Sequence, residues 1–426
     1  MTTTRPFGFW TATALVVGGM IGSGIFMMPA ALAPFGWTGT LAWVVSIAGA
    51  LSIAYTIGRL AQELPQANGA VAIAGAELGE LAGVLIGWSY WVSIWCANAA
   101  IAIAAASYLA AVIPVLGATP ARGALTAVAL LWLLTLLNLA GARRAGQFQV
   151  LTTILKLVPL IAVVVIAAWL GTRGEAQLPP LPAAGTLLGG FATAVTLTLF
   201  PLVGFEAAGV AAERVRDPAR NVMRASMAGT LVTGLLYILV CSAIVLLLPV
   251  ATVTQSSAPF ALFVGQFWGT GASNVIALFA AIAAIGALNG WVLLQGEVPL
   301  GMARAGLLPA WFGRVSRADV PVRVLLLSSG LASALILTTS SPTLGGVFQF
   351  LALLTTCACL WFYLAMCVAA LRRRVAIPAA LVGIGFALFA VWGAGWEASG
   401  LSLLLVASAV PLYLLRPRAV VKPQLA

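Results

Sequence analysis

Two apolar stretches of the chain contain residues that favour irregular backbone, and irregular backbone exposes groups that can bind a charged solute. The first stretch is GGMIGSGIF, Gly18 to Phe26, with four glycines and one serine. Each glycine weakens a helix by roughly 1 kcal/mol relative to alanine, so the helix is expected to unwind here. The freed amides, the serine hydroxyl and the positive end of the following helix would bind a carboxylate. The residues expected to form this segment are Met20, Ile21, Gly22, Ser23 and Gly24.

The second stretch, LFPLVGFEAAG, runs from Leu199 to Gly209. Pro201 removes a backbone donor and clashes with the preceding turn, and Gly204 weakens the helix further. Carbonyls freed around Phe200 to Val203 could accept hydrogen bonds from an ammonium group. Taken alone, the glycines of the first stretch could instead serve close helix packing, because two of them fit the small-xxx-small pattern. Together, the two stretches predict a site for both ends of an amino acid's backbone.

The composition indicates a polytopic membrane protein. Hydrophobic residues make up 62% of the 426 and charged residues 7%, which is too few for a soluble surface of this size. Apolar runs that could cross about 30 Å of hydrocarbon predict about twelve transmembrane helices. Their predicted ranges are 10–33, 37–58, 81–113, 123–141, 148–170, 184–213, 223–249, 271–299, 324–340, 345–371, 376–394 and 397–415. Because unpaired amides in lipid cost several kcal/mol each, the two irregular stretches indicate a cavity inside the protein.

The basic residues indicate the orientation of these spans. The net charge of +11 could suggest a nucleic-acid partner. With the N-terminus in the cytoplasm, however, every Lys and Arg except Arg122, Arg173 and Lys156 falls in an inner loop, as the positive-inside rule requires. We therefore expect a multi-pass protein of the inner membrane, with both termini cytoplasmic and no nucleic-acid partner.

The ends and the cysteines add two smaller expectations. The first apolar run is too long for a signal peptide and has no small-residue cleavage site, so it should remain as a helix. All five cysteines fall within predicted spans, where they pack as small apolar groups, so no disulfide framework is implied.

The two irregular helices are the first and the sixth of the twelve. This spacing predicts an all-α bundle of two inverted five-helix repeats, with the substrate site between them. The expected division of this single transmembrane domain is 8–170 for the first repeat, 184–371 for the second and 376–415 for two additional helices. Such a bundle would alternate access by rocking helices one, two, six and seven against the others.

Several motifs in order resemble the amino acid-polyamine-organocation transporter superfamily. They are GGMIGSGIFMMPA in the first helix, GFEAAGVAAERVRDPARNVMRA from the sixth, and ARAGLLPAWFGRV before the ninth. Within the superfamily, YWVSIWCAN, LFPLVGFEAA and LNGWVLL resemble the bacterial arginine/agmatine antiporters. The resemblance extends over most of the chain, and it implies the inverted-repeat fold and transport of an amino acid or amine.

The resemblance also implies roles for single side chains. Four aromatic residues would act as gates or as stacking faces for the substrate: Tyr90, Phe200, Trp291 and Tyr363. Phe200 stands where the family has a tryptophan, so that stacking face is smaller. Asn98 and Thr355 would line the end of the pocket that holds the substrate side chain. Read without the resemblance, these rings could be core or lipid-facing residues, and Asn98 could bridge two helices.

Two ionisable residues within predicted spans are candidates for proton coupling or pH sensing. Glu206 lies in the second stretch, and the resemblance implies a pH-sensing glutamate there; its alternative is a neutral side chain bonded to helix backbone. Lys156 is expected in the middle of the fifth helix, where desolvation favours a neutral amine; its alternative is snorkelling to the interface. Some proton-coupled members and exchangers of the superfamily carry a lysine here, in the place where sodium-dependent relatives hold sodium. The arginine/agmatine antiporters have an apolar residue instead.

The sequence thus favours a secondary transporter, an antiporter for a cationic amino acid and its amine product, with no cofactor or metal. It could form a homodimer. The alternatives are a proton-coupled permease or exchanger for neutral amino acids and, more distantly, an amino acid sensor that does not transport. An enzyme is disfavoured because the chain has no histidine and only two carboxylates in predicted spans, on different helices. A channel is disfavoured because no span offers a continuous polar lining.

Overall fold

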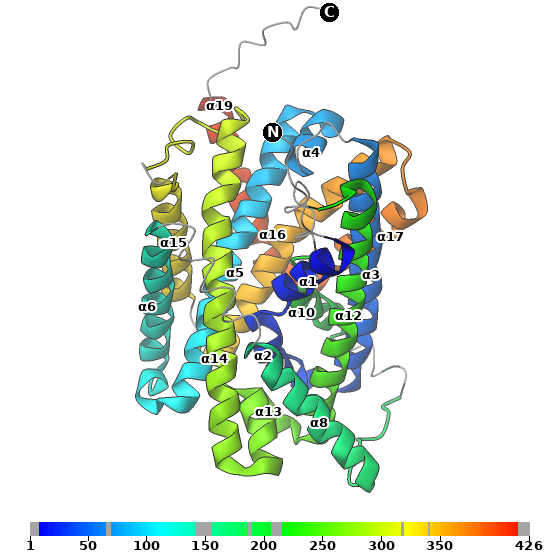
Figure 1. Ribbon diagram of the computed structural model, residues 1–426, viewed down its shortest axis with the longest axis vertical. Coiled ribbons are helices and arrows are strands. Elements are labelled where there is room, and N and C mark those ends of the chain that lie inside the picture. The colour runs from blue at the N-terminus through cyan, green and yellow to red at the C-terminus, as the bar shows by residue number, and fades with distance from the viewer. Residues whose placement is uncertain are drawn as a thin grey trace, which may run out of the picture.

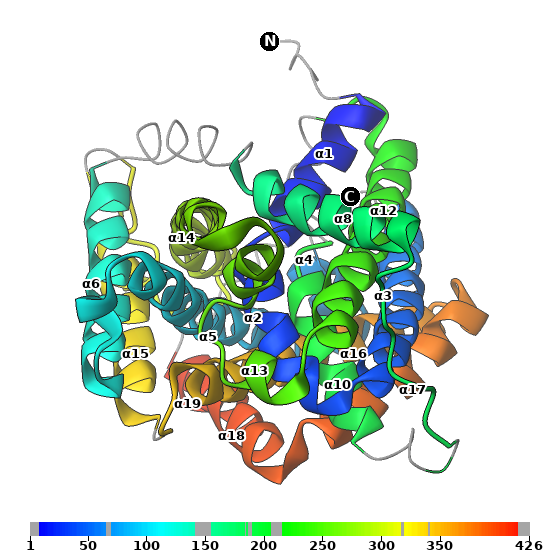
Figure 2. The same ribbon diagram turned by 90° about the horizontal axis from the view of Figure 1, so that it is seen from below.

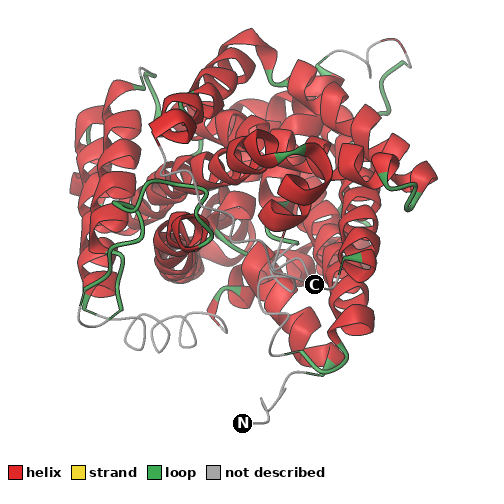
Figure 3. Cartoon of the chain, turned by 90° about the horizontal axis from the view of Figure 1, so that it is seen from above, coloured by secondary structure: helices red, strands yellow, loops and turns green. Residues whose placement is uncertain are grey.

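The computed structural model describes residues 8–64, 70–140, 155–183, 185, 190–205, 215–316, 319–339 and 341–415. Within these ranges the chain is almost entirely helical and contains no β-strand (Figures 1 and 3). Its helices are α1 (Phe9–Met20), α2 (Ser23–Leu32), α3 (Trp37–Glu63), α4 (Ala70–Leu78), α5 (Glu80–Val112), α6 (Pro120–Leu139), α8 (Leu157–Arg173), α10 (Phe191–Leu199), α12 (Pro218–Leu247), α13 (Val250–Thr254), α14 (Pro259–Arg304), α15 (Val322–Thr338), α16 (Leu344–Arg372), α17 (Ile377–Gly393), α18 (Gly395–Ala407) and α19 (Ala409–Leu415). Three 3₁₀ turns accompany them: η1 (Ala33–Phe35), η2 (Pro114–Gly117) and η3 (Phe200–Leu202).

The described helices are consistent with the twelve predicted spans. Seven helices are long and apolar enough to cross a membrane, and α1 with α2, bent by 50° at their break, makes an eighth. Four shorter apolar helices lie where the remaining spans are predicted: Leu157–Arg173, Phe191–Leu202, Val322–Thr338 and Ile377–Gly393. The predicted all-helical membrane fold is therefore confirmed, while the boundaries of the two repeats stay a prediction.

Several boundaries differ from the prediction. The short helices α4 and α13 lie in segments where only connections were expected. Helix α14 begins before the predicted span because two helices join at Gly269, whose φ of 82° is allowed for glycine. Helix α8 begins at Leu157, and residues 148–154 of the predicted fifth span lie outside the described part of the chain.

Helix α5 forms the core of the bundle. It packs against α14 and α16 and, farther out, against α6 (Figures 1 and 2). Its second half, IAIAAASYLAA, is rich in alanine, and small side chains let neighbouring helices approach closely in a membrane. Large apolar side chains instead lie exposed on outer helices, for example Leu136, Leu239, Leu388 and Leu404. This distribution is expected where the outer surface faces lipid.

One helix contact near the broken sixth helix depends on a glycine. The carbonyl of Gly393, at the end of α17, accepts a 2.8 Å hydrogen bond from the Thr193 hydroxyl on α10. A methyl group on Gly393 would overlap the Ala192 carbonyl and approach the Thr196 hydroxyl oxygen to 2.7 Å. Since backbone cannot move aside cheaply, α17 and α10 can pack this closely only with glycine here.

Gly393→Ala is therefore expected to destabilise the protein by about 1–3 kcal/mol, the usual cost of overpacking. The measurement is thermal unfolding of the purified protein in detergent. Gly385→Ala is the matched control, because a methyl group at that position of α17 meets nothing within 4 Å. Equal melting temperatures for the two variants would contradict the proposed close contact.

Candidate functional site

The first helix breaks where the sequence predicts. Helix α1 ends at Met20, Ile21 leaves the helical region with ψ of 92°, and Gly22 is extended with φ of −130° and ψ of −157°. Helix α2 then begins at Ser23. The last carbonyls of α1 and the first amides of α2 have therefore lost the partners that a continuous helix would provide.

The carbonyl end of this break is closed by two neighbouring helices. The Lys156 ammonium, immediately before α8, donates a hydrogen bond to the Gly18 carbonyl. The Tyr237 hydroxyl, on α12, donates a 2.7 Å hydrogen bond to the Met20 carbonyl. Lys156 is only 3% exposed, and its charge lies at the negative end of the α1 dipole. Lys156 thus contacts the break as the N-cap residue of α8. Residues 148–154 lie outside the described part of the chain, so its place in the middle of the fifth helix stays a prediction.

The amide end of the break is open by comparison. The N-cap residue of α2 is Gly22, and no described side chain caps this helix. The start of a helix carries unpaired N–H groups and a partial positive charge. This end of the break can therefore receive a carboxylate.

The sixth helix is interrupted at the second predicted stretch. Helix α10 tightens into the 3₁₀ turn η3, Val203 turns to ψ of 136°, and Gly204 adopts φ of 113°. That positive φ is strained for any residue except glycine. Residues 206–214 lie outside the described part of the chain, so the candidate Glu206 has no described position.

The two breaks face each other. A methyl group placed on Gly24 would lie 3.1 Å from the Phe200 ring and 3.3 Å from the Pro201 Cα. One placed on Gly204 would lie 3.6 Å from the Gly19 carbonyl oxygen. The glycines on each side thus allow the two irregular segments to come into direct contact, although they are about 180 residues apart in the sequence.

Helix α16 runs along the second break and shows that the chain there is stretched. Phe200 packs edge-on against Phe348, with ring centroids 5.7 Å apart, and Phe205 stacks on Tyr363 at 4.9 Å. Phe348 and Tyr363 are separated by about 22 Å of helix, whereas a helix from Phe200 to Phe205 would advance only about 7.5 Å. Thr355 lies between them on α16, buried, and its hydroxyl has no hydrogen-bond partner among the described residues. An unpaired hydroxyl therefore lies at the level of the opened backbone.

Helix α14 connects the first break with Asn98. A methyl group on Gly22 would lie 3.3 Å from the Ala287 Cβ, and half-buried Trp291 follows one turn later. One further turn along, the Gln295 Oε1 accepts a 2.7 Å hydrogen bond from Asn98 Nδ2 on α5. Gln295 was not among the residues predicted from the sequence; the signal that could have identified it is a glutamine within a predicted span.

The remaining gate candidate, Tyr90, also lies against α16. Its ring is 5.0 Å from the ring of Phe362, the neighbour of Tyr363. Tyr90 and Phe200 thus pack against aromatic rings of α16, and Tyr363 lies on α16 itself. The fourth candidate gate residue, Trp291, lies on α14. Among the described residues, no group of three or more His, Cys, Asp or Glu side chains could hold a metal ion.

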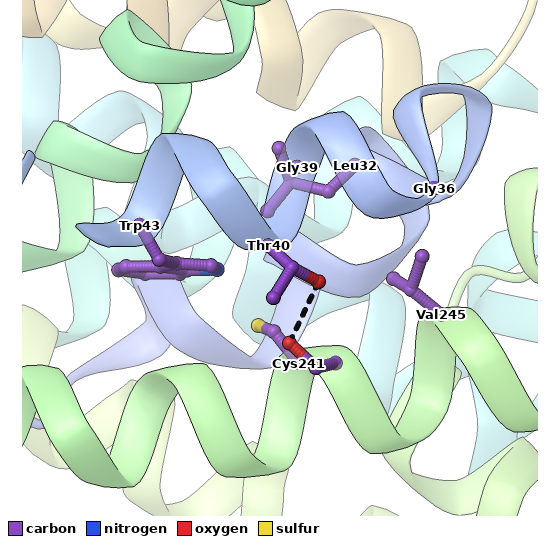
Figure 4. A pocket seen from close by; sticks show the side chains of 8 residues that line it. Leu32, Gly36, Gly39, Thr40, Trp43, Cys241 and Val245 are labelled. Carbon is purple, nitrogen blue, oxygen red and sulfur yellow. Dashed lines mark hydrogen bonds between the residues drawn. The ribbon is translucent and has the colours of Figure 1, made fainter. Parts of the chain in front are cut away.

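A small crevice lies behind Tyr237, between α3 and α12. It is shallow and is bordered by the hydrogen bond between Thr40 and Ser242, 2.9 Å long (Figure 4). Trp43 lines the crevice and packs against the Tyr237 ring at 5.5 Å. The side chain that closes the first break is thus itself held by the crevice wall.

The comparisons with known proteins agree with this architecture. The family model described as amino acid permease matches residues 7–416. The chain belongs to the amino acid permease family. The permease is thus a multi-pass membrane protein and a secondary transporter, as the resemblance to this superfamily implied.

Several relatives are antiporters or polyamine transporters. The permease is 32% identical to a cadaverine/lysine antiporter of Escherichia coli over 81% of its own length and 78% of the relative's. It is 32% identical to a putative arginine/ornithine antiporter of Bacillus subtilis over 87% and 85% of the two chains. A putrescine transporter of Escherichia coli is 28% identical over 92% of each chain. The predicted resemblance to basic amino acid and polyamine antiporters is confirmed.

The closed carbonyl end of the first break gives a testable expectation. Tyr237→Phe keeps the ring but leaves the Met20 carbonyl without its donor, which should cost about 1–3 kcal/mol of folding stability. Ser242→Ala on the same helix is the control, because it removes a hydroxyl-to-hydroxyl bond and leaves no carbonyl unpaired. Thermal unfolding in detergent compares the two. An equal or larger loss for Ser242→Ala would contradict the role given to Tyr237.

Proposed function

We propose that this permease is an antiporter that exchanges a cationic amino acid for an amine across the bacterial inner membrane. The observation that carries the proposal is the contact between two helix breaks, at Gly24 with Phe200 and at Gly204 with Gly19. Backbone groups freed at membrane depth suit a solute that carries an ammonium group and a carboxylate on the same carbon atom. The names of the relatives, which include lysine, cadaverine, arginine, ornithine and putrescine, support a cationic substrate.

At the first break the carbonyl end is hydrogen-bonded and the amide end is uncapped, which suggests how the backbone of the substrate is bound. The carboxylate would meet the open start of α2, at Ile21 to Gly24. The ammonium group would bind carbonyls near η3, between Phe200 and Val203, because the carbonyls of Gly18 and Met20 already accept hydrogen bonds from Lys156 and Tyr237. Met20 would therefore contribute position and packing, and its carbonyl would stay with Tyr237.

The substrate side chain would extend along α14 towards Asn98. Trp291 lies on the way and could stack on a guanidinium or ammonium group by cation–π attraction. Thr355 and Asn98 each have a buried polar atom with no described partner, which a substrate could satisfy. Tyr90, Phe200, Trp291 and Tyr363 would close over the bound solute as gates.

The wider architecture in this proposal follows the sequence. Residues 8–170 and 184–371 would form the two inverted repeats, and 376–415 two further helices. The termini would be cytoplasmic, and two copies could pair as a homodimer. Glu206 would act as a pH sensor and Lys156 in proton coupling. The proposed transport cycle makes and breaks no covalent bond, so no enzymatic step is proposed. The sensor alternative, in which the protein binds an amino acid but does not transport it, is distinguished by the uptake experiment.

The test is uptake of labelled lysine by proteoliposomes. Uptake is expected to depend on lysine or cadaverine loaded inside, because an antiporter reorients across the membrane only with a substrate bound. Neutral amino acids should compete weakly. The second candidate is a proton-coupled transporter of neutral amino acids, which the buried cation Lys156 supports. Two results would favour it: uptake into empty vesicles driven by a pH gradient, or stronger competition by leucine than by arginine. Binding without any flux would favour a sensor.

Lys156 provides a second test. Lys156→Met removes the charged donor to the Gly18 carbonyl, and a hydrogen bond to a charged group is worth roughly 1.5–3 kcal/mol. We therefore expect exchange to fall by about tenfold or more, with a smaller loss for Lys156→Arg, which keeps a cationic donor. Initial rates of exchange, normalised to folded protein, measure the effect. Full exchange by Lys156→Met would exclude a role for the ammonium.

A further inference from the structure

A chain of buried hydrogen bonds crosses four helices and ends at Asn98. It begins at Thr135 on α6, whose hydroxyl lies 2.7 Å from that of Ser329 on α15. Ser329 accepts a 2.8 Å hydrogen bond from Gln295 Nε2 on α14, and Gln295 Oε1 accepts the 2.7 Å bond from Asn98 Nδ2 on α5. All four side chains are 0% exposed. These bonds are therefore shielded from bulk water, and a mismatched donor or acceptor along the chain would be costly.

The direction of every hydrogen bond in the chain follows from its first member. The Thr135 hydroxyl donates its single proton to the Leu131 carbonyl, one turn earlier, at 2.8 Å. Towards Ser329 it can therefore only accept, so Ser329 donates to Thr135 and can only accept from Gln295. Gln295 must then turn its amino group to Ser329 and its carbonyl oxygen to Asn98. Asn98 in turn must present its amino group to Gln295.

This direction determines what Asn98 presents at its other side. Its Oδ1 is buried and has no hydrogen-bond partner among the described residues. Turning the amide round would bring two acceptor oxygens together at Gln295. A buried acceptor without a partner is unfavourable, so the free Oδ1 favours any solute that brings a donor to it.

Helix α14 contacts both the first break and Asn98. Ala287, which approaches Gly22, and Gln295, which holds Asn98, are separated by eight residues of α14, or about 12 Å. Trp291 lies halfway between them. A long substrate side chain that starts at the break would extend along α14 past Trp291, towards the face where Asn98 meets this helix.

We propose that Thr135, Ser329 and Gln295 are positioning residues that orient Asn98 as a hydrogen-bond acceptor, so that the site selects substrates with an N–H donor at the end of the side chain. The chemical class comprises primary ammonium and guanidinium groups, and it excludes hydrocarbon ends of the same length. This inference rests on the proposed function for its substrate, whereas the hydrogen-bond direction is a property of the protein alone.

The decisive variant is Thr135→Val, which has nearly the same shape and no hydroxyl. The Ser329 proton is then free to turn to Gln295, and the amides of Gln295 and Asn98 can both reverse. The experiment compares lysine and norleucine, which differ by the terminal amine, as competitors for labelled substrate. We expect the preference for lysine to fall by about tenfold or more in Thr135→Val. Thr135→Ser, which keeps the hydroxyl, should retain the preference.

Ser333→Ala is the control on α15. Its hydroxyl donates to the Ser329 backbone carbonyl and accepts from Trp132, so it is outside the oriented chain. This variant should keep the preference for lysine. An equal change of preference in Ser333→Ala and Thr135→Val, or a loss in Thr135→Ser as large as in Thr135→Val, would overturn the proposal.

A second readout does not depend on transport. Thr135 and Gln295 both form hydrogen bonds with Ser329, so their effects on stability are coupled. The loss of melting temperature in the double variant Thr135→Val/Gln295→Met should be clearly smaller than the sum of the losses in the two single variants. Additive losses would overturn the oriented chain. If the wild-type protein takes up neither lysine nor norleucine, the proposed antiport fails, and the melting experiment still decides whether the chain orients Asn98.

Discussion

The structure depends on one constraint, that a backbone polar group inside a membrane must find its partner within the protein. A break in the first helix frees carbonyls on one side and amides on the other. The carbonyl side is closed by Lys156 and Tyr237, whereas no described side chain caps the amide side. This asymmetry gives the break a chemical preference, since the groups left open are hydrogen-bond donors at the positive end of a helix. A carboxylate is the group that such an opening favours.

The second break completes the site because the two segments come into contact. Glycine is required at these positions for two different reasons. Gly204 adopts a positive φ, and Gly24 leaves room for the Phe200 ring and the Pro201 backbone. The stretched segment between Phe200 and Phe205 then spreads along α16 and passes the level of Thr355. The same residues that weaken the helices thus build the place where a solute can bind.

Features that depend on local sequence were predictable, and features that depend on distant partners were not. The spans follow from hydropathy, and the breaks from glycine and proline, because both effects act within one helical turn. The partner of the Met20 carbonyl, Tyr237, is 217 residues away, and Gln295 is 197 residues from Asn98. No periodicity in the sequence indicates such pairs. Lys156 shows the intermediate case, since its burial was predictable and its partner, the Gly18 carbonyl 138 residues away, was not.

Hydrogen bonds between helices can be sorted by the two bodies that the proposed rocking would move. On one side, Ser46 of α3 bonds to Thr198 of α10, and α12 bonds to α3 and to α1. On the other, the oriented chain joins α5, α14, α15 and α6. Other bonds connect the helices of the first break and α10 with the rest of the bundle: Lys156 joins α8 to α1, Tyr108 joins α5 to α2, and Thr193 joins α10 to α17. If the first set rocks, the groups that hold the substrate backbone move with it, while Asn98 stays fixed in the second. Selection by the side chain and alternation of access would then depend on different bodies, so a transporter of this design could change its substrate preference without changing how it moves.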